Sequence, residues 1–345
     1  MKKKRGIISF IGVVVAILTI VSSLSYHIPP DLLSISGFFS LLFPLFFLLN
    51  VILFIFFYSR LKKRYSIIAI LISIPLLNNF LSFDASREVF GESDPFKVIS
   101  YNIKSHRLIS PNKIINKDIG KLIQTNSPDV VCLQEVNISG LVNNKQLIIG
   151  GKSYYIYHSG KSNVILSRYR YIHKEGIDIG DTNNSVIYAD IEINNSRIRV
   201  YNCHLQSFRI NPSEYKLYDT LRFKTEKQRM IKGKEFLKKM NAGFKVRAKQ
   251  ARIVKEHVSA CPSAVLVCGD FNSTPSSYTY HILKKGLEDS FVERGYGYGA
   301  SYRRNLVGVR IDYLLHSDDI STNSYKTFTE SNSDHVPIMA TYHIK

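Results

Sequence analysis

Polar side chains suited to hydrolytic chemistry follow several apolar stretches of this sequence. One such stretch is Val267–Pro275. The apolar run Ala264–Cys268 leads into it, and Gly269, Asp270 and Asn272 follow. The run predicts a buried strand, and Gly269 gives the backbone freedom to turn after it. Residues two apart in an extended segment point the same way, so we expect the Asp270 carboxylate and the Asn272 amide to act at one point. Such a pair can hold a water molecule beside a phosphoryl oxygen.

Other predicted strands also end in polar residues of this kind. The polar residues at the strand ends are Asn102, Glu135, His204, Asp270, Asn272, Asp312, Asp334 and His335. Taken singly, each has an ordinary explanation, such as a turn residue, a charge at a helix start or a hydrogen-bonded core histidine. As a set, these carboxylates, amides and imidazoles are the groups that metal-assisted phosphoryl chemistry uses.

The elements that would position these residues indicate a mixed α/β domain from about residue 96 onward. Apolar residues at helical spacing predict helices within Asn112–Thr125 and Lys249–Ala260. Two strand-like runs joined by Asn194-Asn195 predict a hairpin whose second strand delivers His204. Further strands are expected at Lys97–Asn102, Asp129–Glu135, Val164–Arg168, Arg310–His316 and Pro337–His343.

Three apolar stretches precede this domain, at about residues 6–24, 35–58 and 66–83, within a predicted transmembrane region of residues 1–85. Each is close to the ~20 residues that a helix needs to cross a bilayer. The first stretch lacks a small-residue cleavage site and two more stretches follow it, which argues against a signal peptide.

Basic residues set the expected topology. They precede the first stretch and separate the second from the third, so the positive-inside rule places both regions in the cytoplasm. We therefore expect a multi-pass protein of the bacterial cytoplasmic membrane, with its catalytic domain on the extracytoplasmic side. A re-entrant third stretch, which contains Pro75, Asn78 and Asn79, would reverse that side.

Net charge indicates the class of binding partner, and cysteine spacing indicates the role of the cysteines. The net charge of +19 indicates an anionic partner, such as nucleic acid, anionic lipid or a phosphorylated substrate. The four cysteines form no CxxC pair, and three of them lie in apolar strand-like runs, so we interpret them as core residues.

Six short motifs, taken in chain order, resemble those of the endonuclease/exonuclease/phosphatase superfamily, which includes DNase I, apurinic endonucleases, inositol polyphosphate 5-phosphatases and neutral sphingomyelinases. The motifs are Tyr101-Asn102-Ile103, Leu133-Gln134-Glu135-Val136, Asn202-Cys203-His204-Leu205, Gly269-Asp270-Phe271-Asn272, Ile311-Asp312-Tyr313 and Ser333-Asp334-His335-Val336-Pro337. The resemblance covers residues 96–345. It implies a four-layered α/β (α+β) sandwich, in which two mostly antiparallel sheets face each other between helices and the motif loops gather at one end.

The resemblance also implies a metal site. Glu135 would be the main ligand of a divalent ion, Mg²⁺ or Mn²⁺, with Asn102 and Asp334 assisting, since hard oxygen ligands suit both ions. Lys104 stands where many members carry an acidic or amide side chain that helps a second metal, which favours a one-metal site. The site is expected to be lined further by Asn163 and Ser167.

The remaining strand-end residues acquire catalytic roles from the same resemblance. Asp270 would orient or deprotonate the attacking water, and Asn272 would bind the phosphoryl group. His204 and His335 would contact the scissile phosphate or transfer protons, and their roles could be exchanged. Asp312 would hold a histidine in its useful tautomer.

A basic insertion at about residues 208–248 bears on the substrate. Residues 208–257 contain 15 Lys or Arg against 5 Asp or Glu, and Tyr215–Met240 mixes them with aromatic and aliphatic residues. This composition favours an anionic membrane surface as the partner. A solvated helix pair or a groove for a nucleic-acid backbone would have a similar composition. Three spans followed by such a domain also resemble bacterial membrane proteins associated with glycopeptide resistance, whose implied chemistry is dephosphorylation of a polyprenyl pyrophosphate carrier.

These observations together predict a membrane-anchored, divalent-metal-dependent phosphoesterase. Its phosphate ester is expected to be lipid-linked, as in a polyprenyl pyrophosphate or a phospholipid-type head group. One alternative is a metal-dependent endo- or exonuclease acting on DNA or RNA, which would share the same residues. The other is a non-catalytic membrane-anchored binding module, against which every matched position carries a competent residue. The sequence specifies neither the oligomeric state nor the choice among monophosphate, pyrophosphate and diester.

Overall fold

The chain folds into two compact units in the computed structural model. The structure describes residues 2–56, 63–83, 93–104, 109–110, 113–114, 117–143, 145–209, 226–304, 307–329 and 331–345. Unit 1 consists of Met1–Leu77, Gln206–Lys249 and Ser276–His281, and unit 2 consists of Asn78–Leu205, Gln250–Pro275 and Ile282–Lys345. Two segments of the predicted soluble domain therefore group with the N-terminal helices. The aromatic and basic residues predicted to act at 210–225 lie outside the described residues.

Unit 1 opens with three helices joined by short connections. They are α1 Lys2–Leu24, α2 Ile35–Phe56 and α3 Lys63–Leu77, with a 3-10 helix at Ser25–His27. Small polar side chains lie where the helices meet: the Thr19 hydroxyl donates to the Phe46 carbonyl at 3.0 Å, and the Asn50 amide donates to the Ser66 carbonyl at 3.4 Å. Small and polar residues at helix contacts are typical of helices that pack inside a membrane.

Two of these helices are long and apolar enough to cross a membrane, at Gly6–His27 and Ile35–Phe56. The third predicted span is not supported in the described residues. The described part of α3 has 15 residues, which corresponds to about 22 Å, against a hydrocarbon core of about 30 Å. The helix contains Pro75 and gives way to a turn at residue 78, which explains why it ends early. The predicted side of the catalytic domain depends on this span and stays a prediction.

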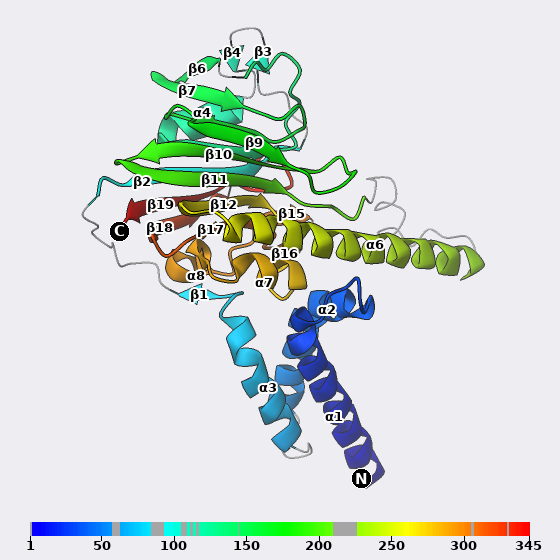
Figure 1. Ribbon diagram of the computed structural model, residues 1–345. Helices are drawn as coiled ribbons and strands as arrows, with labels where there is room; N and C mark the ends of the chain where they lie inside the picture. Colours follow the sequence, from blue (N-terminus) through cyan, green and yellow to red (C-terminus); the bar gives the residue numbers. More distant parts are fainter. Residues whose placement is uncertain are drawn as a thin grey trace. The chain divides into compact units, whose positions relative to one another are not determined.

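Unit 2 contains two sheets (Figure 1). One has six strands in the order β13-β17-β12-β11-β10-β9, and the other has seven in the order β18-β19-β2-β5-β8-β7-β6. The first sheet consists of β9 His173–Ile177, β10 Ser185–Ile193, β11 Ser196–His204, β12 Ala264–Asp270, β13 Glu288–Asp289 and β17 Asp312–His316. The second consists of β2 Phe96–Asn102, β5 Val130–Gln134, β6 Gln146–Ile149, β7 Lys152–Tyr157, β8 Val164–Ser167, β18 Ile320–Thr327 and β19 Ile338–Ile344.

Smaller elements complete the chain. Two-stranded ribbons pair β1 Ser82–Phe83 with β14 Tyr296–Gly297, β3 Ile109–Ser110 with β4 Lys113–Ile114, and β15 Tyr302–Arg304 with β16 Val307–Val309. The remaining helices are α4 Lys117–Asn126, α6 Glu226–Ser259, α7 Tyr278–Lys284 and α8 Ser290–Arg294. The helix predicted at 249–260 is thus the end of a much longer one.

The two sheets share one hydrophobic core. Val98 and Val130 of the seven-stranded sheet pack in the same cluster as Val200 and Leu266 of the six-stranded sheet. Helix α4 covers the outer face of the seven-stranded sheet through buried isoleucines. The end of α6 contacts the outer face of the other sheet, where the Tyr201 hydroxyl lies 2.9 Å from a nitrogen of His257. The predicted four-layered sandwich is confirmed.

The pairing of the strands explains why polar residues collect at one end. Each sheet is antiparallel except for one central parallel pair, β2 with β5 and β11 with β12. The carboxyl ends of parallel neighbours lie at the same sheet edge, and an antiparallel neighbour begins there. The residues brought to these edges are Asn102 and Gln134, followed by Glu135, in one sheet, and His204, Asp270 and Asp312, which are register partners, in the other.

The predicted hairpin is confirmed and fixes the position of His204. Strands β10 and β11 pair across Asn194 and Asn195, whose φ angles are 50° and 62°. Two consecutive residues with positive φ form the turn type that matches strand twist, and Asn tolerates it. The register pairs Ser185 with His204 at the far end.

Candidate active site

Asn102 joins the polar residues that end the two sheets. Its side-chain nitrogen donates to Glu135 Oε1 and to Asp270 Oδ2, each at 3.0 Å. Its side-chain oxygen accepts from the backbone N–H of Lys104 at 3.0 Å. The side chain is buried and therefore fixed by these three bonds. The structure thus gives Asn102 a positioning task, between two carboxylates, and its predicted help with a metal stays a prediction.

Asp312 and His335 form a buried pair beside Asp270. His335 Nδ1 lies 2.9 Å from Asp312 Oδ2, and its Nε2 lies 3.7 Å from Asp270 Oδ2. The bond to Asp312 requires a proton on Nδ1 and turns Nε2 toward Asp270. The predicted pairing of Asp312 with a histidine is thus seen in the geometry, and the histidine is His335.

The charges of this group follow from its burial and its neighbours. Burial alone would lower the pKa of His335, but the Asp312 and Asp270 carboxylates outweigh it and raise that pKa to about 9. Burial raises the pKa of Asp270 to about 7, against the opposing effect of His335. Near neutral pH the site therefore holds an imidazolium beside a carboxyl group that can give or take a proton, as general acid–base chemistry requires.

His204 lies in the same cluster but stays neutral. Its Nε2 lies 3.6 Å from Glu135 Oε1 and 4.0 Å from Asp270 Oδ2. Burial lowers its pKa to about 4, partly opposed by Glu135. The Asn184 amide nitrogen lies 3.1 Å from Nε2 and also donates to the Leu205 carbonyl, so Nε2 is the acceptor. Asn184 was missed from the sequence because it stands in a polar run that reads as an ordinary turn.

The backbone around these residues adopts conformations that the sequence pattern did not predict. Gly269 lies inside β12 rather than in a turn, with a φ of 132°, and a Cβ there would lie 1.9 Å from the Cys203 carbonyl oxygen. Glu135 and Asn272 have φ angles of 52° and 51°. Asn272 is therefore not extended; its N–H donates to Asp270 Oδ1 at 2.7 Å. Left-handed non-glycine residues of this kind are concentrated at functional sites.

Asp334 lies beside the cluster and forms an ion pair with Lys104. The Lys104 ammonium lies 2.8 Å from Asp334 Oδ2, and both side chains are partly exposed. The preceding Ser333 hydroxyl donates to the Asn102 carbonyl at 2.9 Å, which attaches this loop to the end of β2. Asp334 is thus near the cluster but already paired, and its predicted metal role stays a prediction.

Of the two residues expected to line the site, one lies beneath it and one does not belong there. Asn163 is buried and donates to the Ser185 and Asn202 carbonyls, within a set of amides that links the two sheets. Ser167 pairs with Val130 at the opposite end of the sheet, because β8 runs antiparallel to β5. The expectation for Ser167 was wrong: the chain direction of β8 places its start, not its end, at the site.

The donors in the cluster fit a hard divalent cation. Three carboxyl groups, of Glu135, Asp270 and Asp312, face one cation, His335, while Asp334 is already paired with Lys104 beside the cluster, which leaves a surplus of negative charge. Asp312 Oδ1 has no hydrogen-bond partner among the described residues, and the Glu135 side chain is 34% exposed. Asp270, Asp312 and His335 also place one ligand atom each within 4.8 Å of one another. A divalent ion held by Glu135 or by this triad would polarise a phosphoryl oxygen.

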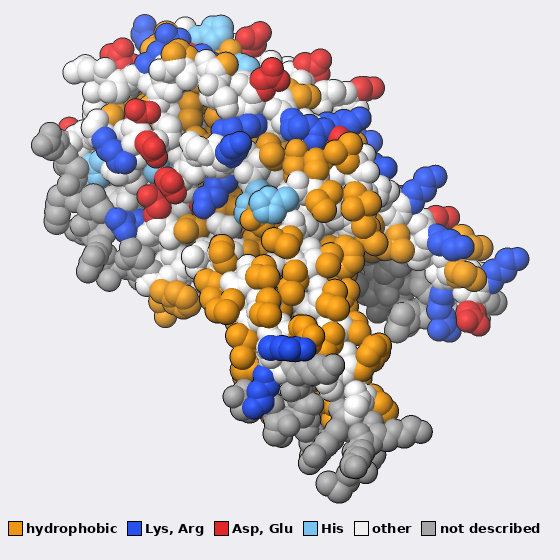
Figure 2. Space-filling model, turned by 60° about the horizontal axis from the view of Figure 1, so that its bottom comes forward, with side chains coloured by type: hydrophobic (Ala, Val, Ile, Leu, Met, Phe, Trp, Pro, Cys, Tyr) orange, Lys and Arg blue, Asp and Glu red, His pale blue; other side chains and the backbone are white. Residues whose placement is uncertain are grey.

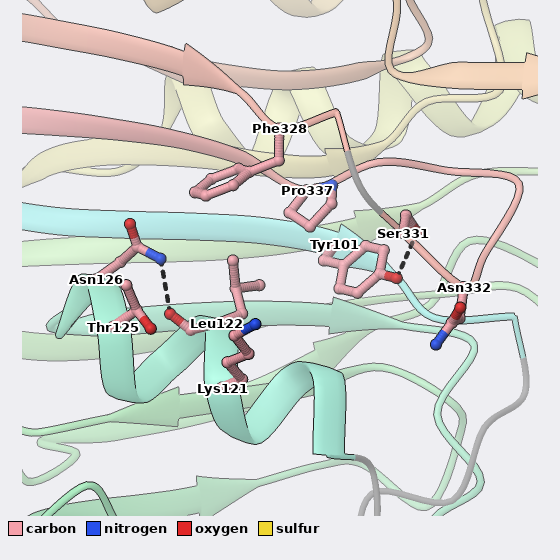
Figure 3. A pocket seen from close by; sticks show the side chains of 9 residues that line it. All are labelled: Tyr101, Lys121, Leu122, Thr125, Asn126, Phe328, Ser331, Asn332 and Pro337. Atoms are coloured by element: carbon pink, nitrogen blue, oxygen red, sulfur yellow. Dashed lines mark hydrogen bonds between the residues drawn. The ribbon is translucent and has the colours of Figure 1, made fainter.

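A cavity of about 300 Å³ lies on the outer face of the seven-stranded sheet (Figure 3). Its lining includes Tyr101 and Leu122 on one side and Phe328 and Pro337 on the other. The Tyr101 hydroxyl lies 2.7 Å from that of Ser331. Because successive residues of a strand face opposite sides, Tyr101 and Asn102 point to different faces of β2. The cavity is therefore separate from the polar cluster.

One solved structure shares this fold, and two others are similar to this chain. An endonuclease/exonuclease/phosphatase from Bacteroides vulgatus is 13% identical over 73% of this chain and 100% of its own, with a TM-score of 0.50. A mannosyl-6-phosphatase from Bacteroides thetaiotaomicron is 14% identical over 72% of this chain and 100% of its own, with a TM-score of 0.49. ANGEL2, a 2',3'-cyclic phosphatase, is 15% identical over 73% of this chain and 96% of its own, with a TM-score of 0.49.

Two family models match this chain, one over the N-terminal helices and one over the α/β domain. A domain of unknown function matches residues 5–80, and no curated protein matches the chain. The Endonuclease/Exonuclease/phosphatase family matches residues 99–335, which run from β2 to the histidine paired with Asp312. Since this match covers more than half of the 345 residues and includes the whole polar cluster, the chain belongs to the endonuclease/exonuclease/phosphatase family, whose members are phosphoesterases and nucleases that typically need a divalent metal.

Proposed function

We propose that this protein is a membrane-anchored, Mg²⁺-dependent phosphoesterase that hydrolyses a lipid-linked phosphate, such as a polyprenyl pyrophosphate or a phospholipid-type head group. The observation that carries the chemistry is the convergence of Glu135, Asp270 and His335 on Asn102 and Asp312 at one end of the sandwich. A carboxyl group with a pKa near neutrality beside a charged imidazole supplies both partners of a proton transfer.

The lipid part of the proposal is supported by a different observation. The chain carries two helices long and apolar enough to cross a membrane. The segments that directly follow His204 and the Asp270–Asn272 motif in sequence, residues 206–249 and 276–281, belong to the same compact unit as those helices. A phosphate group displayed on a membrane is a substrate that such an anchored enzyme meets by diffusion in two dimensions.

In this mechanism the side chains act on a water molecule and on the phosphoryl group. Asp270, oriented by Asn102 and by the Asn272 N–H, accepts a proton from the water as its oxygen bonds to phosphorus. His335, held as an imidazolium by Asp312, stabilises the charge that develops on the phosphoryl oxygens. It then gives a proton to the leaving oxygen as the old P–O bond breaks. Neutral His204 lies beside Glu135, with its Nε2 3.6 Å from Glu135 Oε1.

The test is phosphate release by full-length protein in detergent from a polyprenyl pyrophosphate, with Mg²⁺ and with EDTA. The Asp270→Asn variant serves as the control for contaminating phosphatases. We expect metal-dependent release that the variant lacks. Release that persists in the variant would refute the assigned chemistry.

The same protein should be offered plasmid DNA and a phosphodiester lipid. Metal-dependent nicking without phosphate release would show the nuclease that the family name also allows, with affinity falling steeply as salt rises. Cleavage of the diester alone would keep the enzyme class and change the head group.

A further inference from the structure

One side of α6 continues its apolar stripe beyond the part that is packed. Met230, Leu237, Met240 and Phe244 follow one another at spacings of seven, three and four residues, so they share one helix face. Met240 and Phe244 are 7% and 8% exposed. Met230 and Leu237 are 56% and 51% exposed. The stripe is therefore covered in its second half and open in its first.

The covered half of the stripe contacts the beginning of α2. The Phe244 ring lies 5.2 Å from that of Phe38, edge to face, and a Cβ on Gly37 would lie 2.5 Å from the Phe244 ring. Gly37 and Phe38 belong to the first turn of α2, which begins at Ile35. A 22-residue helix is about 33 Å long and the hydrocarbon core about 30 Å thick, so this turn lies near the membrane boundary. If α2 spans the bilayer as proposed, the stripe meets it at the level of the lipid head groups.

Basic residues flank the open half of the stripe. Lys234 and Lys238 lie on one side of Leu237 and Arg229 lies on the other, and all three are exposed. Figure 2 shows Lys and Arg side chains beside hydrophobic ones on the first half of α6, and a dense hydrophobic surface on the N-terminal helices. Exposed apolar anchors bordered by lysine and arginine are typical of helices that lie on anionic bilayers.

We propose that the first half of α6, from Glu226 to Met240, lies on the surface of an anionic lipid bilayer and inserts Met230 and Leu237 between its head groups. This inference rests on the membrane anchoring proposed above. It adds a second attachment, continuous with the helix contact at Phe38, that would orient unit 1 at the membrane surface. The alternative occupants of this helix face, nucleic acid or a second copy of the chain, are outcomes of the test.

The chain contains no Trp, so a single introduced Trp is an unambiguous fluorescent probe. Leu237→Trp reports on the open stripe. Glu235→Trp, two residues away on the opposite helix face and exposed, is the matched control. Leu48→Trp, at a 56% exposed position in α2, reports on anchoring by itself. Each full-length variant is reconstituted in bilayers with brominated acyl chains, made of phosphatidylcholine alone or with phosphatidylglycerol.

We expect the Leu237→Trp emission to lose about half its intensity in bilayers that contain phosphatidylglycerol, because such a helix buries its apolar face at the head-group boundary. Glu235→Trp should keep its emission, and the loss at 237 should shrink in phosphatidylcholine alone. Quenching at Leu48→Trp with none at Leu237→Trp, or with equal quenching at 235, would overturn the surface attachment and leave the anchor intact. Unquenched Leu48→Trp would show that the anchoring itself is wrong.

Two further measurements distinguish nucleic acid from a second copy of the chain as the occupant of this helix face. A short DNA duplex that changes the emission of Leu237→Trp, in bilayers that do not quench it, would overturn the proposal in favour of nucleic acid. Emission at 237 that depends on protein density in the bilayer, and not on its lipid, would do so in favour of a second copy.

Discussion

Asp270→Asn should make the protein more stable and inactive at the same time. Asp270 is 1% exposed, and burial raises its pKa from 3.8 to about 7. Between these pH values the folded protein keeps a proton that the unfolded chain has released. The free energy of unfolding therefore falls as the pH rises from about 4 to about 7 and stays low above that range. The buried carboxyl group therefore lowers stability at neutral pH, a cost that the proposed role of Asp270 as a base would explain.

The magnitude follows from the two pKa values and from the hydrogen bonds. A separation of about three pKa units corresponds to about 4 kcal/mol at 1.36 kcal/mol per unit. Asparagine removes this cost, but its oxygen can accept from only one of the two donors, Asn102 and the Asn272 N–H. The mismatched donor costs about 1–3 kcal/mol. The variant should therefore be about 1–3 kcal/mol more stable at pH 8, which raises its Tm by roughly 2–4 °C per kcal/mol.

The assay is thermal unfolding of the full-length protein in detergent and EDTA, at pH 8 and near pH 4. Near pH 4 the wild-type carboxyl is neutral in the folded protein and about half ionised in the unfolded chain, so most of its burial cost vanishes and the wild type should become the more stable protein. Asp318→Asn, which changes an exposed carboxylate, controls for net charge and should show no such reversal. An Asp270→Asn variant that is less stable at pH 8, or a difference that does not depend on pH, would refute the reasoning.

The remaining predictions concern the charges around Asp270. In Asp312→Asn the pKa of His335 should fall well below its value of about 9, because less negative charge then opposes the effect of burial. The alkaline limit of kcat/KM should move to lower pH, and an unmoved limit would count against the Asp312–His335 pair. Glu135→Gln should weaken Mg²⁺ binding in calorimetry by at least roughly tenfold, and more than Asp312→Asn does; the reverse order would assign the ion to the buried triad instead. Lys104→Met should raise Mg²⁺ affinity by removing the counter-ion of Asp334, measured in the same titrations; unchanged affinity would show that Asp334 does not face the ion.

The fold could be predicted because its signals are local. Apolar runs of strand length, a hairpin turn at Asn194-Asn195 and the helical spacing in α4 each depend on a few neighbouring residues. The third span stays a prediction, because its composition is also a local signal and the described helix is short. Its composition resembles a membrane helix, but Pro75 and the turn that follows end the described helix early. The sequence predicted a helix at 249–260 and helical character in the basic segment before it, but not that the two form one continuous helix, α6.

The sequence predicted which strand-end residues would lie together, but not which of them would be bonded to each other. Strand ends and motif order identify Glu135, His204 and Asp270, since each requires only its own strand. That Asn102 bonds two carboxylates, and that Asp312 pairs with His335 rather than His204, depends on side chains 23 to 168 residues apart in sequence. A local sequence pattern cannot predict contacts between residues so far apart in the chain.

Both the sequence and the structure single out Lys104. The sequence marks it as a departure from the family pattern, and the structure shows its partner, the Asp334 carboxylate at 2.8 Å. With the two side chains 55% and 28% exposed, such an ion pair contributes about 0–1 kcal/mol. A divalent ion or a phosphoryl oxygen can therefore displace either member at little cost. We therefore expect Lys104 to act as an exchangeable counter-ion that neutralises Asp334 until a divalent ion binds, which the Lys104→Met titrations test.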